Sequence, residues 1–177
     1  MKSYVKGLVV AVQFLAILTV GVMFGSSDVW SQEKDGTLGK QIQGNWTLVS
    51  IYNELEGKKT DVFGANPRGL MILTPEGRFS LIIMKASLPK FAANNRVKGT
   101  AEENQAVVEG SIGYFGSYQV TDDKEQKVGM KIEGSTFPNY DGQDQIRIMT
   151  ITGDEMKVTN PTAGVGGTNY LVWKRAK

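Results

Sequence analysis

The sequence predicts an all-β fold, an eight-stranded antiparallel up-and-down barrel with a short helix between strands 3 and 4. Short runs in which apolar and polar residues alternate recur along the chain after residue 43, and this period is typical of strands. Turn residues separate successive runs, so neighbouring strands can pair as hairpins. Closing such a sheet removes its exposed edges. An open two-sheet sandwich is the alternative arrangement.

The first predicted strand covers residues 45–53, and its side chains alternate in character along the whole run. The segment from Glu54 to Pro67 is rich in glycine, charge and proline, which indicates a loop. Residues 69–74 and 78–84 form the next two strands. Pro75-Glu76-Gly77 joins them as a tight turn, because proline presets φ and glycine accepts a positive φ.

Residues 85–110 break the alternating pattern, and their second half predicts a helix. Thr100 precedes Glu103 by three positions, which is the spacing of a capping box at a helix start. We therefore expect a short helix over about 101–109, packed against the body of the domain. Alternation then resumes in five further predicted strands at residues 114–121, 127–135, 144–152, 155–160 and 169–175.

The N-terminus has the pattern of a secretion signal, predicted over residues 1–31. Lys2 and Lys6 precede an uncharged, mostly apolar stretch over 7–24, and small polar residues follow it. Cleavage after Ser31 fits this pattern, and cleavage after Ser26 is a rival. An uncleaved membrane anchor is the alternative, since the stretch is just long enough to span a bilayer.

This assignment predicts a periplasmic or secreted protein, or a membrane-anchored one if the signal is retained. A polar linker over 32–43 and one barrel domain over 44–177 make up the rest of the chain. The oligomeric state does not follow from the sequence.

Composition excludes several classes of chemistry. The chain contains neither cysteine nor histidine, so disulfides, thiol catalysis, Ser-His-Asp triads and histidine metal sites are impossible. The formal net charge is only +2 at pH 7, which gives no reason to expect nucleic acid or an anionic membrane surface as a partner. We expect no metal and no cofactor.

Gly44-Asn45-Trp46 at the start of the first strand resembles the lipocalin signature. This resemblance implies that Trp46 packs across the closed end of the barrel and that an arginine late in the chain lies over its ring. Arg175, at the end of the final strand, is the natural candidate for this cation–π contact. Alternatively, Trp46 is only a large core residue.

Four longer stretches resemble, in order, the bacterial lipocalin-like domain family. They are FGANPRGLMILTPEGRFS, the segment from AEE to EGSIGYFGSYQV, IEGSTFPNYDGQDQIR and YLVWKR, and the likeness covers about 43–177. Members often carry a histidine near Met130 or Lys131, which this chain lacks. A role that rests on that histidine cannot apply here.

Inward-facing polar residues are the candidate ligand contacts. Strand alternation allows a cavity set of Arg78, Tyr114, Tyr118, Glu133 and Arg147. In that arrangement Glu133 and Arg147 pair across neighbouring strands, with Tyr118 within reach, because a buried unpaired charge is costly. Alternatively, these charges face water and the aliphatic faces form the core.

Two classes of function fit this reading. The first is an exported barrel that binds a small hydrophobic or amphipathic molecule. The second is an isomerase or cyclase in which Tyr118 and Glu133 act as acid and base and Arg147 stabilises an oxyanion. A structural envelope protein whose barrel is filled by its own side chains is a third possibility.

Overall fold

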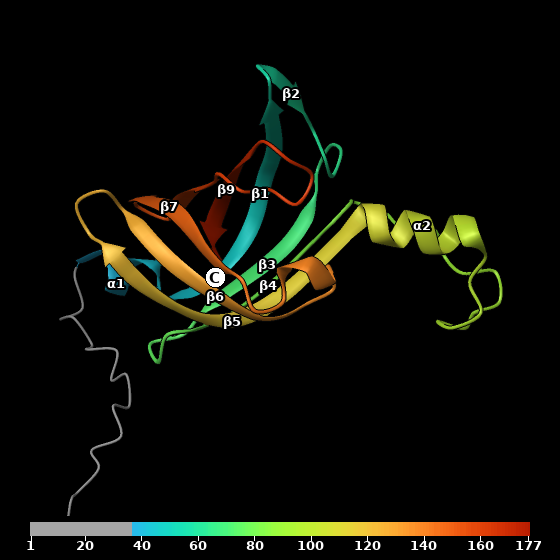
Figure 1. Ribbon diagram of the computed structural model, residues 1–177, viewed down its shortest axis with the longest axis horizontal. Helices are drawn as coiled ribbons and strands as arrows, with labels where there is room; N and C mark the ends of the chain where they lie inside the picture. Colours follow the sequence, from blue (N-terminus) through green and yellow to red (C-terminus); the bar gives the residue numbers. More distant parts are fainter. Residues whose placement is uncertain (1–36) are drawn as a thin grey trace, which may run out of the picture. The chain divides into compact units, whose positions relative to one another are not determined.

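A computed structural model describes residues 37–177, so the predicted signal peptide over 1–31 lies outside the described residues. Figure 1 shows the elements in chain order. They are α1 (Thr37–Ile42), β1 (Gly44–Leu55), β2 (Lys58–Thr60), β3 (Arg68–Leu73), β4 (Arg78–Met84), α2 (Ala101–Gly110), β5 (Ser111–Asp122), β6 (Lys127–Ser135), the 3-10 turn η1 (Pro138–Tyr140), β7 (Asp144–Thr152), β8 (Glu155–Asn160) and β9 (Thr168–Arg175).

The sheet closes on itself, which confirms the predicted barrel. Nine strands form one antiparallel sheet in the order β2-β1-β3-β4-β5-β6-β7-β8-β9, and β1 also pairs with β9. The three-residue β2 pairs only with the far end of β1, so the other eight strands make the barrel. The short β2 is an additional strand that was not predicted, and it raises the number of every later strand by one. The expected helix α2 therefore lies between β4 and β5 rather than between strands 3 and 4.

Local sequence signals hold two connections in place. Gly77 takes a φ of +75° in the β3–β4 turn, and the backbone N–H of Thr74 donates to the carbonyl of Arg78 at 2.8 Å. The predicted capping box starts α2: Glu103 N–H donates to Thr100 Oγ1 at 3.2 Å, and Thr100 N–H donates to the Glu103 carboxylate at 2.9 Å.

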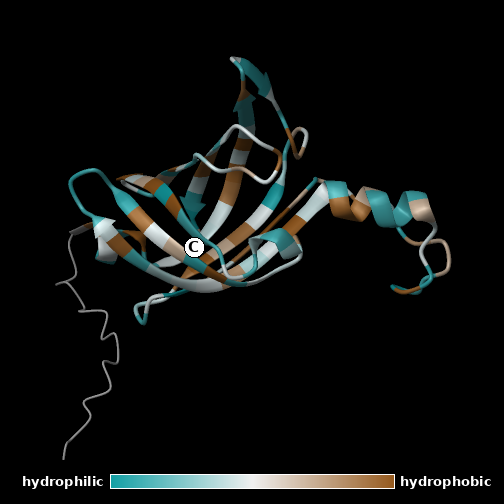
Figure 2. Cartoon of the chain, in the orientation of Figure 1, coloured by the Kyte–Doolittle hydropathy of each residue, from teal (hydrophilic) through white to brown (hydrophobic). Residues whose placement is uncertain are grey.

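The core consists of the aliphatic faces of the strands, which point into the barrel. Figure 2 shows hydropathy alternating along the strands. On β4 the buried side chains are Phe79, Leu81 and Ile83, and on β6 they are Val128, Met130 and Ile132. The predicted inward position of the opposite faces, which carry Arg78 and Glu133, is wrong. Folding buries the face of each strand that removes more apolar area from water, and the charged faces of these two strands stay outside.

Helix α1 covers one end of the barrel and lies within residues 32–43, the range predicted to be a polar linker. Leu38 and Ile42 stand one turn apart on this helix and are fully buried in the same core as Trp46. The backbone N–H of Leu38 donates to Asp123 in the β5–β6 turn at 3.0 Å, which ties the helix start to the wall. The barrel domain therefore begins before Gly44.

The expected contact between Trp46 and Arg175 is present at this closed end. Trp46 is fully buried and its indole N–H donates to the carbonyl of Ile42 at 2.8 Å. The Arg175 guanidinium carbon lies 4.2 Å from the centre of the Trp46 ring, a cation–π geometry. The same guanidinium donates to the carbonyls of Gln41 and Gln43, both at 2.8 Å, so it also caps the end of α1.

The glycine of the Gly-x-Trp motif has its own explanation. Gly44 has a φ of +118°, which side chains rarely adopt, and a Cβ there would lie 3.1 Å from the Arg175 guanidinium. Glycine thus lets the chain pass from α1 into β1 while Arg175 stays over Trp46.

No helix among residues 37–177 is both long enough and apolar enough to cross a membrane.

Candidate functional site

The barrel contains a cavity of about 360 Å³. Its walls are mostly aliphatic and come from inward-facing positions of the strands, including Met71, Leu81, Met149, Val158 and Leu171. The loops and helix α2 at the end opposite α1 add apolar side chains around its mouth, among them Phe63, Val108 and Val165. A cavity of this size and lining is typical of a site for one small, largely apolar molecule.

Arg147 is the one charged side chain that is buried among residues 37–177, and it lines this cavity at 2% exposure. It lies on β7, two residues before the apolar Met149, so the two side chains share one face of the strand. Its guanidinium donates to the carbonyl of Ile146 at 2.9 Å and to the side-chain oxygen of Gln145. Both acceptors are neutral.

Asparagines form a polar layer on the strands that follow β7. Asn160 on β8 pairs in register with Asn169 on β9, and Asn169 pairs with Asn53 on β1. The register of β7 with β8 places Arg147 next to this row. The Asn53 amide donates to Asn169 Oδ1 at 2.9 Å and to the carbonyl of Gly166 at 2.8 Å. The loop between β8 and β9, to which Gly166 belongs, therefore helps to hold this layer in place.

Two tyrosines, Tyr114 and Tyr140, add hydroxyl groups to the cavity wall. Tyr114 on β5 and the buried Tyr140 on η1 pack edge to face with ring centres 5.8 Å apart, and both line the cavity. Burial raises the pKa of Tyr140, and Tyr114 raises it further, whereas the positive charge of Arg147 acts in the opposite direction. Tyr140 is therefore a neutral hydroxyl at physiological pH.

Trp173 adds a further polar atom to the cavity wall. Its side chain is 1% exposed, and its indole Nε1 is the one buried side-chain nitrogen or oxygen among the described residues that has no hydrogen-bond partner. A buried N–H without an acceptor costs the protein free energy, so such an atom is rare in a folded core.

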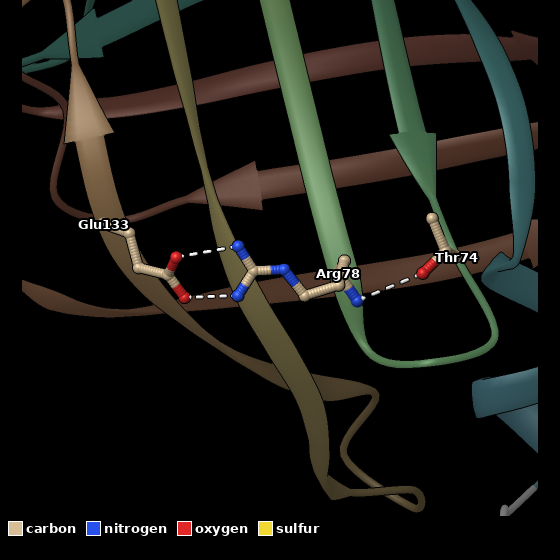
Figure 3. Close-up of polar contacts among 3 residues, drawn as sticks. All are labelled: Thr74, Arg78 and Glu133. Atoms are coloured by element: carbon tan, nitrogen blue, oxygen red, sulfur yellow. Dashed lines mark hydrogen bonds and ion pairs between the residues drawn. The ribbon is translucent and has the colours of Figure 1, made fainter.

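The five predicted cavity residues lie in different parts of the structure, and only two of them line the cavity. Tyr114 and Arg147 lie on the cavity wall, and their contact with a ligand stays a prediction. Arg78 and Glu133 lie outside the barrel, with side chains 49% and 38% exposed, and they form a two-pronged ion pair with each other (Figure 3). That pair lowers the pKa of Glu133 through its hydrogen bonds.

The expected buried pair of Glu133 with Arg147 is therefore wrong. Glu133 shares the outward face of β6 with Lys131, and its partner is Arg78, two strands away on β4. Charges stay in water where an aliphatic face of the same strand can be buried instead.

Tyr118 has a structural position rather than a place on the cavity wall. Its hydroxyl donates to the carbonyl of Thr74 at 2.7 Å, which fastens the β3–β4 turn to β5 at the closed end. Tyr118, Glu133 and Arg147 thus do not converge on one point, and the acid–base arrangement considered for an enzyme is not formed.

Several cavity residues were not predicted, although the spacing of two of them along their strands indicates that they face inward. Asn160 shares the inward parity of Met156 and Val158, and Asn169 shares that of Leu171 and Trp173. Alternation along these two strands would have found both asparagines. Tyr140 comes from a connecting turn, so no strand period points to it.

Comparison with known proteins agrees with this architecture. Residues 43–176 match the family described as a lipocalin-like domain. The chain is also similar to a protein of Aspergillus oryzae named "4'-hydroxy-3'-methoxypropiophenone carrier protein ppsC". The two are 26% identical over 102 residues, a match that covers 52% of this chain and 92% of the relative.

Proposed function

The chain belongs to the lipocalin-like domain family, and we propose that it binds a small, mostly apolar molecule inside the barrel. The observation that carries this proposal is the apolar cavity of about 360 Å³ within a closed sheet. An eight-stranded barrel has just enough interior for one small ligand. The carrier name of the Aspergillus oryzae relative also supports a binding role.

The two alternatives find less support. An isomerase or cyclase needs an acid and a base that reach the same substrate. Here Glu133 is held outside the barrel by Arg78, and the Tyr118 hydroxyl is engaged by Thr74. A barrel filled by its own side chains does not agree with the open volume that Met149, Val158 and Leu171 surround.

Filling the cavity should abolish binding. Val158 is buried on the cavity wall, so Val158→Phe places a ring in the space that the ligand needs. We expect the affinity for N-phenyl-1-naphthylamine, a neutral apolar dye that fluoresces when desolvated, to fall by roughly tenfold or more, as fluorescence titration measures it.

Thr159→Phe is the matched control, because Thr159 is the next residue on β8 and faces away from the cavity. Thermal melting of both variants would show that each is folded. Equal dye affinity in the wild-type chain and a folded Val158→Phe variant would place the binding site elsewhere.

We further propose that the protein is exported to the periplasm or the medium. Lys2, Lys6 and the apolar stretch over 7–24 support this proposal. Leu15→Arg interrupts that stretch with a charge, and should retain the chain in the cytoplasm. Cell fractionation measures where each chain is found, and mass spectrometry of the N-terminus shows whether the signal is removed. Full-length wild-type protein in the cytoplasm would refute export.

A further inference from the structure

We propose that the ligand of this cavity is an amphipathic organic anion, with an acidic group that binds Arg147 and an apolar body that occupies the aliphatic part of the barrel. This inference rests on the proposed function and adds the chemical class of the ligand. It follows from an imbalance of charge and of hydrogen-bond donors inside the barrel.

The first observation is that the positive charge of Arg147 has no counter-ion within the part of the chain that the structure describes. A guanidinium stays protonated in proteins, and burying a charge is costly unless an opposite charge accompanies it. None of the ion pairs among the described residues includes Arg147. Glu109 also lines the cavity, but it is an exposed residue near the C-terminal end of α2, and its carboxylate accepts a hydrogen bond from Gln105 at 2.7 Å.

The second observation is that two buried side chains on the cavity wall carry N–H donors that the described residues do not fully satisfy. Arg147 has two acceptors, the carbonyl of Ile146 and the side chain of Gln145, and a guanidinium carries more N–H donors than these can satisfy. The indole N–H of Trp173, which also lines the cavity, has no acceptor among residues 37–177. Oxygen atoms of a bound ligand would provide the missing acceptors.

The third observation is that the surroundings of Arg147 suit an anion attached to an apolar body. Met149 and Val158 lie beside the charged and polar positions on β7 and β8, so aliphatic wall and guanidinium face the same space. An ion pair formed there is protected from water, which strengthens it relative to one at the surface. A cation would be repelled, and a wholly apolar ligand would leave Arg147 unpaired.

Two dyes with the same ring skeleton test this proposal in the full chain. 1-Anilinonaphthalene-8-sulfonate carries an anionic group, and N-phenyl-1-naphthylamine is its neutral counterpart. We expect the wild-type chain to bind the sulfonate at least roughly tenfold more tightly, as one charge-assisted interaction allows. Arg147→Met should remove this preference by weakening sulfonate binding while leaving the neutral dye unchanged.

Two further variants serve as controls. Arg96→Met removes the same charge from an exposed loop position and should leave both affinities unchanged. Arg147→Lys keeps the charge but not the forked geometry, so it should keep part of the preference for the sulfonate. The wild-type preference needs no variant, so the test stands even if a substitution at position 147 prevents folding.

The possible failures are distinguishable. Equal wild-type affinity for the two dyes would overturn the anionic ligand and leave the binding function intact. If a folded Arg147→Met variant still prefers the sulfonate, then a group other than Arg147 binds the anion, and the assignment to Arg147 is overturned. Failure of the wild-type chain to bind either dye would refute the binding function, and this inference with it.

Discussion

Replacing Trp46 with alanine should lower the free energy of unfolding by about 3–5 kcal/mol, as truncation of a large buried aromatic does. Trp46 is fully buried between α1 and the barrel core. The change removes its packing, its hydrogen bond to Ile42 and the surface on which the Arg175 guanidinium lies. Urea or thermal denaturation followed by circular dichroism measures the effect.

Phe115→Ala is the matched control, since Phe115 is an aromatic residue on the outer face of β5 and is half exposed. Its loss should cost much less than that of Trp46. Arg175→Ala should give an intermediate loss, because the carbonyls of Gln41 and Gln43 lose their donor. An unchanged denaturation midpoint in Trp46→Ala would refute its role in closing the barrel end.

Removing α1 should cost a similar amount. A chain that starts at Gly44 lacks Leu38 and Ile42, both fully buried against the closed end. Each such aliphatic side chain contributes about 1.5–3 kcal/mol by burial, so we expect a loss of about 3–6 kcal/mol relative to a chain that starts at Thr37. Urea denaturation of the two shortened chains measures the difference.

A chain that starts at Gln32 is the control and should be as stable as the one that starts at Thr37. If the chain from Gly44 unfolds at the same urea concentration as these two, then α1 is only a tether, as a linker over 32–43 would be.

The fold could be predicted from the sequence because its strands carry local signals. All eight predicted barrel strands are present, and the turn at Gly77 and the capping box at Thr100 form as their residue types predict. Each of these features depends on residues that are close together in the sequence. The contact between Trp46 and Arg175 joins residues that are far apart in the sequence, and it could be predicted because the Gly-x-Trp motif marks Trp46 and the final strand ends at Arg175.

The orientation of two strands was less predictable. On β4 both faces carry aliphatic residues, for example Leu81 and Ile82, so alternation alone does not say which face is buried. On β6 the buried face carries Val128, Met130 and Ile132, so the predicted inward position of Glu133 is wrong. Glu133 instead meets Arg78, a contact set by the pairing of three strands.

Helix α1 and Tyr140 depend on the tertiary structure. A six-residue helix is too short to be stable alone, and it persists here because Leu38 and Ile42 close the barrel. Tyr140 reaches the cavity from a turn whose course depends on the packing of its neighbours. The register of the strands also decides that, among the described residues, Arg147 has no counter-ion and the Trp173 indole N–H has no acceptor.

A crystal structure of the protein with 1-anilinonaphthalene-8-sulfonate is the most direct test of the central claim, that the barrel interior receives an apolar ligand whose anionic group meets Arg147. We expect the aromatic rings to lie among Met149, Val158 and Leu171, with a sulfonate oxygen at hydrogen-bond distance from the Arg147 guanidinium. A dye bound on the outer surface, with the barrel interior filled by side chains, would contradict it.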